Sequence, residues 1–361
     1  MRSLLWLWLA IACNAEQTWD QLFTVDWNTC SRKNIDGRFD KVLKYAYPLM
    51  KSSVTGIAEL QEGAITDDEE AMVFTDTSLM RRLRNAGLMW GIPYYPQCTP
   101  GGLNDEDEAK LAEVGKRVDW GQQLLQGKQT GPNDMQLKPD NILVACGDES
   151  YRKTTNAHDI DSDVPDGTST QDSMDKPWVW HIPPAPNTRK PKQSRKYIFP
   201  EGREREDRLC QPDDTAIVFY QPPGGGDRAM IQMILCPPFW ADDVRFDLDT
   251  GHQPRAVDYL GAYKFASAMF IHELYHTFGP MFSDKEYTVK GAGKKIFKPY
   301  GADRIAAIAN YPKRFKAVKT GDAVSTLGLP DAFQFFAVAS HWPGTDWRPF
   351  LPNMPVPRNS L

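Results

Sequence analysis

The chain has 361 residues, of which 41% are apolar and 25% are charged, and its formal net charge at pH 7 is −5. This length is enough for one large domain or two smaller ones. A mildly acidic balance without a basic stripe argues against nucleic acid as a partner.

The N-terminus has the pattern of a secretory signal peptide over residues 1–15. Arg2 precedes an apolar run over residues 4–13, and Cys13 and Ala15 place small residues where a signal peptidase requires them. We therefore expect cleavage after Ala15 and a secreted, extracellular protein. The apolar run is too short to span a bilayer, which takes about 17 residues or more, so no membrane anchor is expected.

Five cysteines remain after that cleavage. An oxidising compartment allows them at most two intrachain disulfides and leaves one thiol over. The sequence does not decide the pairing among Cys30, Cys98, Cys146, Cys210 and Cys236.

The first third of the chain is mainly helical in pattern. Apolar residues recur at helical spacing over residues 38–60 and again over residues 105–125. Pro48 should kink or break the first helix, because proline lacks the backbone N–H and its ring clashes with the preceding turn. A short apolar run at residues 141–146 then predicts a strand.

Residues 147–212 differ from the rest in composition, since polar residues, proline and lysine dominate. Trp178 and Trp180 are the main apolar exceptions. We interpret this segment as a long surface insertion, partly disordered, rather than a second domain. Two apolar runs at residues 216–220 and 230–236 follow, and they predict strands joined by a glycine-rich loop.

A helix is predicted from about residue 254 to residue 278, where a Gly-Pro pair stops it. Two shorter helices are expected at residues 302–310 and 330–341. The tail at residues 346–361 is rich in proline, and we expect it to be extended.

The long predicted helix carries the motif His-Glu-x-x-His at His272, Glu273 and His276. Residues four apart lie about 40° from one another around a helix, so the two imidazoles can point at one ion. A zinc ion held in this way lowers the pKa of a bound water to about 7. Glu273, beside that water, can take its proton and pass it to a leaving amine. The alternative is a set of ordinary surface polar residues, which the apolar neighbours of the motif disfavour.

A catalytic zinc ion usually has three protein ligands, so one more residue is needed. Asp284 is the residue we favour, because it lies eight residues after His276 and the chain can turn back after the Gly-Pro pair. Glu286, Asp303 and His341 remain alternative third ligands. Asp284 could also be a solvated aspartate in a turn.

Several segments match a known pattern in order. They are Ile-Leu-Cys-Pro-Pro-Phe-Trp at residues 234–240, the His-Glu-x-x-His motif, Asp-Lys-Glu-Tyr at 284–287, Tyr-Gly at 300–301, and Leu-Pro-Asp-Ala-Phe-Gln-Phe-Phe-Ala at 329–337. Together they resemble the deuterolysin or aspzincin family of secreted fungal zinc endopeptidases, which includes lysine-specific members.

This resemblance implies an α+β fold of the zincin-like kind, with a small sheet packed on the metal-binding helix and further helices around it. The core would span residues 141–345. Residues 16–140 would be either the helical N-terminal part of the catalytic domain or a pro-like segment.

The resemblance also implies one catalytic Zn2+ ion with His272, His276 and Asp284 as its ligands and Glu273 as the general base. Protein or peptide substrates are expected, and the protein is expected to be a monomer.

By the same resemblance, a tyrosine donates a hydrogen bond to the oxyanion of the tetrahedral intermediate. Tyr287 has the expected spacing from Asp284, but an apparent insertion at residues 288–299 makes Tyr300 the alternative. The other reading of the chain is a catalytically inactive secreted zinc-binding or host-interaction protein of the same fold. The imperfect match after Asp284 motivates it, and the presence of Glu273 argues against it.

Overall fold

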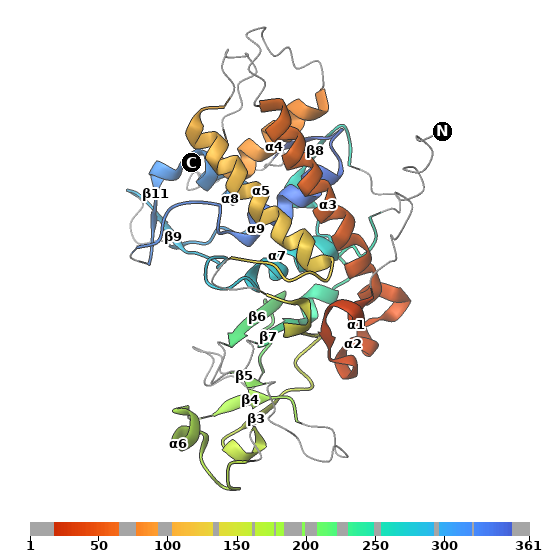
Figure 1. The fold of residues 1–361 in the computed structure, drawn as a ribbon, viewed down its shortest axis with the longest axis vertical. Helices are drawn as coiled ribbons and strands as arrows, with labels where there is room; N and C mark the ends of the chain where they lie inside the picture. Colours follow the sequence, from red (N-terminus) through yellow and green to blue (C-terminus); the bar gives the residue numbers. More distant parts are fainter. Residues whose placement is uncertain are drawn as a thin grey trace, which may run out of the picture.

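The structure is a computed structural model. It describes residues 18–64, 77–92, 103–132, 137–160, 163–176, 178–183, 197–198, 208–221, 230–248, 254–291, 296–319 and 321–348. These residues form an α+β structure in which most helices gather at one end together with β8, β9 and β11, while the sheets that contain β6 and β7 and β3–β5 extend toward the other end (Figure 1). The predicted signal peptide and Cys98 lie outside the described residues. Within the described ranges, no helix has the length and apolar character needed to cross a membrane.

The longest helix, α3 (Arg38–Ala64), organises the helical end. It packs against α4 (Thr77–Trp90), α5 (Asp105–Leu125), α7 (Ala266–His276) and α9 (Pro330–His341). Its buried side chains recur every three or four residues, which is the period of one helix face; they include Phe39, Val42, Leu43, Ala46, Leu49, Met50, Ile57 and Leu60.

Helix α3 continues through Pro48, so the expected break does not occur. Leu49 and Met50 directly after the proline are almost fully buried. Contacts with neighbouring helices on both sides of Pro48 therefore outweigh its local cost of about 3 kcal/mol.

The central sheet has the strand order β1-β2-β7-β6. The strands β1 (Thr24–Val25), β2 (Ile142–Ala145) and β7 (Met230–Leu235) are parallel, whereas the edge strand β6 (Ala216–Gln221) runs antiparallel to β7. The three strands predicted over residues 141–146, 216–220 and 230–236 are thus confirmed.

Alternate residues of β7 point to opposite faces of this sheet. Ile231, Met233 and Leu235 belong to the main hydrophobic core with the helices. Ile234 belongs instead to a second, smaller core on the other face. The sheet therefore separates two hydrophobic clusters.

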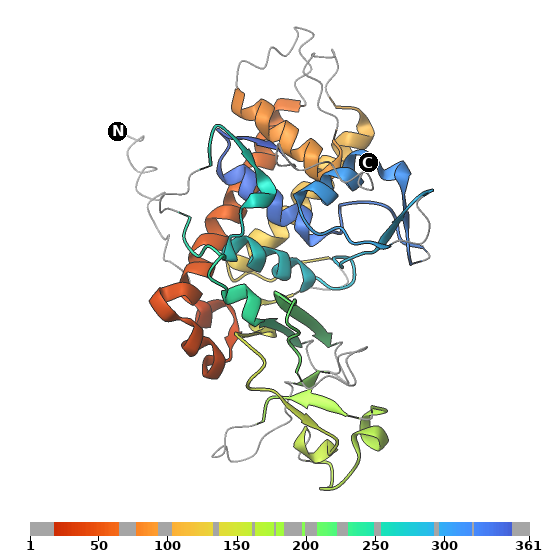
Figure 2. The same ribbon diagram turned by 180° about the vertical axis from the view of Figure 1, so that it is seen from behind.

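The second cluster belongs mainly to the predicted polar insertion. Here β3 (Arg152–Thr154), β4 (Val179–His181) and β5 (Tyr197–Ile198) form a three-stranded sheet, accompanied by the short helix α6 (Thr170–Met174). Figures 1 and 2 both show it at the end opposite the helices. The described part of the insertion is thus more regular than its composition predicted. The apolar side chains that make this possible include Tyr151, Trp178, Trp180, Ile198 and Leu209.

Two disulfides join distant segments, which is the number that the cysteine count allows at most. Cys30 in α2 (Trp27–Lys33) is bonded to Cys146 at the end of β2. Cys210, after the three-stranded sheet, is bonded to Cys236 at the end of β7.

The helix predicted over residues 254–278 is wrong in its first half. Helix α7 begins at Ala266, and the preceding residues include the strand β8 (Val257–Tyr259). This strand pairs in parallel with β12 (Asp346–Arg348), which lies in the predicted extended tail. The partner strand is far away in sequence, so a local pattern could not reveal the pairing. Residues 349–361 of the tail lie outside the described residues.

The helices α8 (Ala302–Asn310) and α9 begin and end where they were predicted. Helix α4 and the short helix α1 (Trp19–Leu22) were not predicted. In α1, Trp19 stacks on Phe39 at 4.0 Å and meets Phe270 of α7 edge-on at 5.3 Å. The N-terminal helices therefore share one hydrophobic core with α7.

Candidate metal centre

Packing fixes the rotation of α7 about its axis. Phe270 and Leu274 are fully buried in the main core. His272 and Glu273, on the remaining face, consequently line a cleft beside the helix, and His276 lies one turn further along. His272 is only 9% exposed and Glu273 only 7%.

The two imidazoles face each other through their Nε2 atoms, which lie 3.1 Å apart. The Nδ1 atom of His272 is 2.6 Å from a carboxylate oxygen of Asp331, and that of His276 is 3.0 Å from the carbonyl oxygen of Phe282. Each Nδ1–H can donate to its acceptor, which leaves both Nε2 lone pairs directed at the same point.

Asp284 completes a group of three ligand atoms. Its carboxylate oxygens lie 3.8 Å from Nε2 of His272 and 3.4 Å from Nε2 of His276. Gly279, with a φ of +82°, makes the turn that brings the chain back after α7. Ligands about 2.0–2.1 Å from a tetrahedral ion lie about 3.3 Å from one another, so this spacing fits a zinc-sized cation. These three side chains are the group that could hold a metal ion within the described ranges.

A β-hairpin brings the side chain of Tyr300 next to the carboxylate of Asp284. The strands β9 (Tyr287–Val289) and β10 (Ile296–Phe297) are antiparallel, and continuing their register outward sets Asp284 opposite Tyr300. A side-chain hydrogen bond joins these two residues. The same register sets Glu286 opposite Lys298, whose ammonium lies 3.6 Å away.

The electrostatics of the cluster favour a positive charge. Burial alone would raise the pKa of Asp284, but the hydrogen bond from His276, the nearby imidazole charges and Tyr300 lower it to about 2. Burial would likewise lower the pKa of His272, whereas the surrounding carboxylates, Asp331 first, raise it to about 10. The carboxylates that favour a proton on His272 would attract a metal cation bound between these groups in the same way.

Glu273 lines the same cleft but is not one of the three converging ligands. Burial raises its pKa, and the charges of His272 and His276 oppose that rise. A buried carboxylate next to a metal position and outside the ligand set suits a general base better than a ligand.

Asp331 is a further residue of the cluster, and its contact with His272 was not predicted from the sequence. One carboxylate oxygen faces His272, and the other accepts the backbone N–H of Gly301 at 2.7 Å. Asp331 and Gln334 are buried polar residues three apart on the otherwise largely apolar helix α9. That pair of polar residues in an apolar helix is the sequence signal that could have identified this face.

The structure does not bring Tyr287 to the cluster. Its side chain is fully buried, and its hydroxyl donates to the carbonyl oxygen of Ser325 at 3.3 Å. Burial raises the pKa of Tyr287 to about 12. Tyr300, the alternative, lines the cleft beside Asp284.

The other candidate ligands lie elsewhere. His341 has its Nδ1 atom 3.3 Å from the hydroxyl of Ser52. Glu286 does not line the cleft, and it pairs with Lys298, which does. Asp303, in the first turn of α8, is not part of the ligand cluster.

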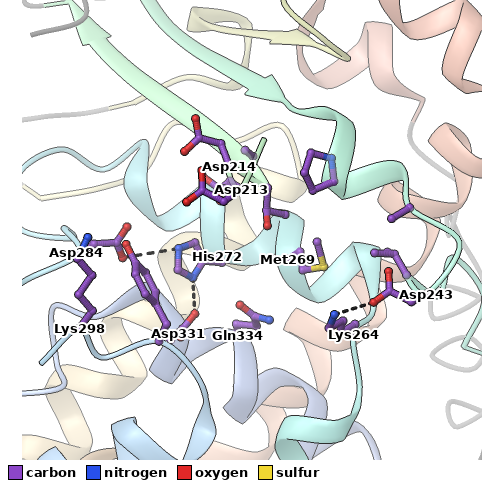
Figure 3. A pocket seen from close by; sticks show the side chains of 17 residues that line it. Asp213, Asp214, Asp243, Lys264, Met269, His272, Asp284, Lys298, Asp331 and Gln334 are labelled. Carbon is purple, nitrogen blue, oxygen red and sulfur yellow. Dashed lines mark hydrogen bonds and ion pairs between the residues drawn. The ribbon is translucent and has the colours of Figure 1, made fainter. Parts of the chain in front are cut away.

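The cleft that exposes this cluster has a volume of about 560 Å³. It lies between α7, α9 and the segment that leads into β6. Figure 3 shows His272 near its middle, Asp284 on one side, and Met269 with the Asp243–Lys264 pair on the other.

Comparison with family models, with curated proteins and with solved structures gives no significant match for this chain. The site is therefore interpreted from its own residues and geometry.

Proposed function

We propose that the protein is a secreted zinc-dependent endopeptidase. The observation that carries this proposal is the convergence of one carboxylate oxygen and two Nε2 atoms from Asp284, His272 and His276. Two imidazoles and a carboxylate form one of the common ligand sets of catalytic zinc, and they leave a fourth position for solvent or substrate. The hydrogen bonds at both Nδ1 atoms add the outer support that such ligands generally have.

Secretion is supported by the signal-like N-terminus and by the two disulfides, which persist in oxidising compartments. We also infer a divergent relationship to the deuterolysin family and a zincin-like arrangement. The position of Asp284, eight residues after His276 and within reach of both imidazoles, supports that inference.

The residues around the cluster have distinct roles in the proposed reaction. When bound, zinc lowers the pKa of its water to about 7 and polarises the scissile carbonyl. Glu273 accepts the proton of the attacking water on its carboxylate and then delivers it to the leaving amine. Asp331 and the Phe282 carbonyl hold the imidazoles in the tautomer that leaves Nε2 available.

We assign the oxyanion donor to Tyr300 rather than to Tyr287. The phenol of Tyr300 lies at the edge of the cleft, next to Asp284, and burial followed by that carboxylate raises its pKa. It therefore stays protonated at neutral pH, and its O–H can turn from Asp284 to a developing negative charge.

The decisive test is Glu273→Gln, which keeps the shape of the side chain and removes the base. Zinc measured by plasma mass spectrometry should remain at one ion per chain, while hydrolysis of a denatured protein falls by about 100- to 10,000-fold. Glu106→Gln, the same change on an exposed side chain in the first turn of α5, away from the cleft, is the matched control and should keep both properties.

Two outcomes would contradict the proposal. A purified protein that stays free of zinc despite ample supply would refute the metal site. Stoichiometric zinc without hydrolysis of any denatured protein at neutral pH would favour the inactive zinc-binding alternative.

A further inference from the structure

We propose that the Met269 end of the cleft is a side-chain subsite that selects an uncharged residue of the substrate, with Gln334 as the residue that determines this selection. The proposal rests on the proposed peptidase function and deepens it by naming a substrate class. Three observations support it: an apolar wall, a neutralised pair of charges, and a side-chain amide that faces the cleft.

The apolar wall lies one helical turn from the metal ligand. Met269 is three residues before His272, so the two side chains share a face of α7. Pro238, Ala241 and Val244, in the segment after β7, line the same end of the cleft. Three residues of a helix rise about 4.5 Å, and an extended peptide advances about 3.3 Å per residue. A peptide whose scissile bond lies at His272 therefore places a neighbouring side chain against this wall.

The charges at this end of the cleft cancel one another. Asp243 and Lys264 form an ion pair of 2.7 Å at the rim, where each side chain is 63% exposed. Asp331 uses one oxygen for His272 and the other for the backbone of Gly301. Neither the wall nor its rim therefore offers an unpaired charge to a substrate side chain.

Gln334 supplies the polar group of the subsite. It is 8% exposed, yet it lines the cleft and makes no hydrogen bond with any other residue in the described part of the chain. Figure 3 shows its amide between Asp331 and Lys264, below Met269. The amide atoms of Gln334 are not sealed in the core, so a ligand in the cleft can reach them.

This combination recognises uncharged side chains. The amide of Gln334 can donate to or accept from a neutral polar group, and the apolar wall accepts an aliphatic stem. A lysine or glutamate entering here loses water without gaining an opposite charge, which disfavours it. Asp213 and Asp214 lie across the cleft, in the turn before β6. If the protein preferred peptides with a cationic side chain, these two carboxylates, rather than Gln334, would determine the selectivity.

Peptide binding tests this separately from catalysis. In the zinc-loaded Glu273→Gln protein, fluorescence anisotropy would measure the dissociation constants of dye-labelled peptides that differ at one position only: leucine, glutamine, lysine or glutamate. We expect leucine and glutamine peptides to bind at least about 10-fold more tightly than the lysine and glutamate peptides. Adding Gln334→Glu should change the ratio of the affinities for the lysine and leucine peptides by about 10-fold in favour of the lysine peptide.

Gln171→Glu provides the matched control, because it makes the same change on an exposed side chain of α6, away from the cleft. It should leave all four affinities unchanged. If Gln334→Glu does not fold, Met269→Glu tests the same subsite from the partly exposed wall and should shift the ratio in the same direction.

Equal affinity for the four peptides, a preference for lysine in the parent protein, or an unchanged ratio in Gln334→Glu would overturn the subsite. Failure of the two proposals is distinguishable. Selective peptide binding by a protein that never hydrolyses peptides would refute the peptidase and keep the subsite. Hydrolysis by the wild-type protein without selection would refute the subsite alone.

Discussion

The α7–α9 pair and the three-stranded sheet β3–β5 hold their polar groups by different means. In the first region, Tyr275 of α7 stacks on Phe333 of α9 at 4.2 Å, deep in the main core. In the second, the strands have three residues or fewer, and the chain after them is tied down by the Cys210–Cys236 disulfide. A carboxylate oxygen of Asp148 also accepts the backbone N–H groups of residues 209 and 210.

The difference shows where a precise polar cluster can be built. Two helices packed through aromatic rings can hold His272 and Asp331 at 2.6 Å without covalent help. A sheet with a small hydrophobic core is stabilised instead by a disulfide and by hydrogen bonds to the carboxylate of Asp148. Perturbing the cluster should therefore change chemistry and leave the fold intact, whereas perturbing the disulfide should change local stability and leave the metal site intact.

The largest expected effect concerns the oxyanion donor. Tyr300→Phe should lower kcat by about 100- to 1,000-fold, because it removes one donor to the developing charge. Zinc content should not change, since the three ligands remain. Tyr287→Phe is the matched control: it loses only a bond to a backbone carbonyl, so kcat should stay near the wild-type value. Steady-state kinetics that gave the reverse result would restore Tyr287 to this role.

Removal of the second disulfide should have the next largest effect. Replacing Cys210 and Cys236 together by serine releases a loop of 26 residues and should cost about 3 kcal/mol of stability in the three-stranded sheet. Hydrogen exchange should show faster exchange in β3 and β4 and unchanged exchange in α7. Equal loosening of α7 and a loss of zinc would show that the two regions form one cooperative unit.

Asp331→Asn tests the support of the ligands. The amide can still accept a hydrogen bond from His272 but no longer carries the charge that stabilises a metal-bound imidazole. Zinc affinity should fall by about 10- to 100-fold, as is typical for outer residues of metal sites. Asp303→Asn, on the neighbouring helix α8, should leave the affinity unchanged in a competition titration with a chelating dye. An unaltered affinity in Asp331→Asn would show that packing alone orients the ring.

The parts of the fold that could be predicted have local causes. Helix α5 is evident from its apolar spacing, and the motif residues His272 and His276 follow from the period of a helix. The pairing of β8 with β12 and the contact of Asp331 with His272 join residues that are far apart in sequence, so no local pattern encodes them. The position of Tyr300, rather than Tyr287, beside Asp284 has the same origin, because it depends on the register of a hairpin.

The smallest effect concerns a carboxylate that resembles Asp331 in its bonding but has no metal site beside it. Asp258 accepts hydrogen bonds from the Tyr263 hydroxyl at 2.5 Å and from the backbone N–H of Tyr259 at 2.9 Å. Burial alone would raise the pKa of Asp258, but these bonds and those from Arg255 lower it to about 2.

Because the folded-state pKa of Asp258 is below the unfolded value of about 3.9, its contribution is complete above that value and is lost as the pH falls through about 2. Asp258→Asn should therefore lower the free energy of unfolding by about 1–2 kcal/mol at pH 6. At pH 2.5 the difference in free energy of unfolding between the wild type and the variant should be smaller. Urea unfolding in the presence of a chelator at both pH values removes any contribution from metal loss. If the difference in free energy of unfolding stayed constant from pH 6 to pH 2.5, neutral hydrogen bonds rather than the charge of Asp258 would stabilise this turn. The charge of a buried carboxylate would then matter only at the ligand cluster.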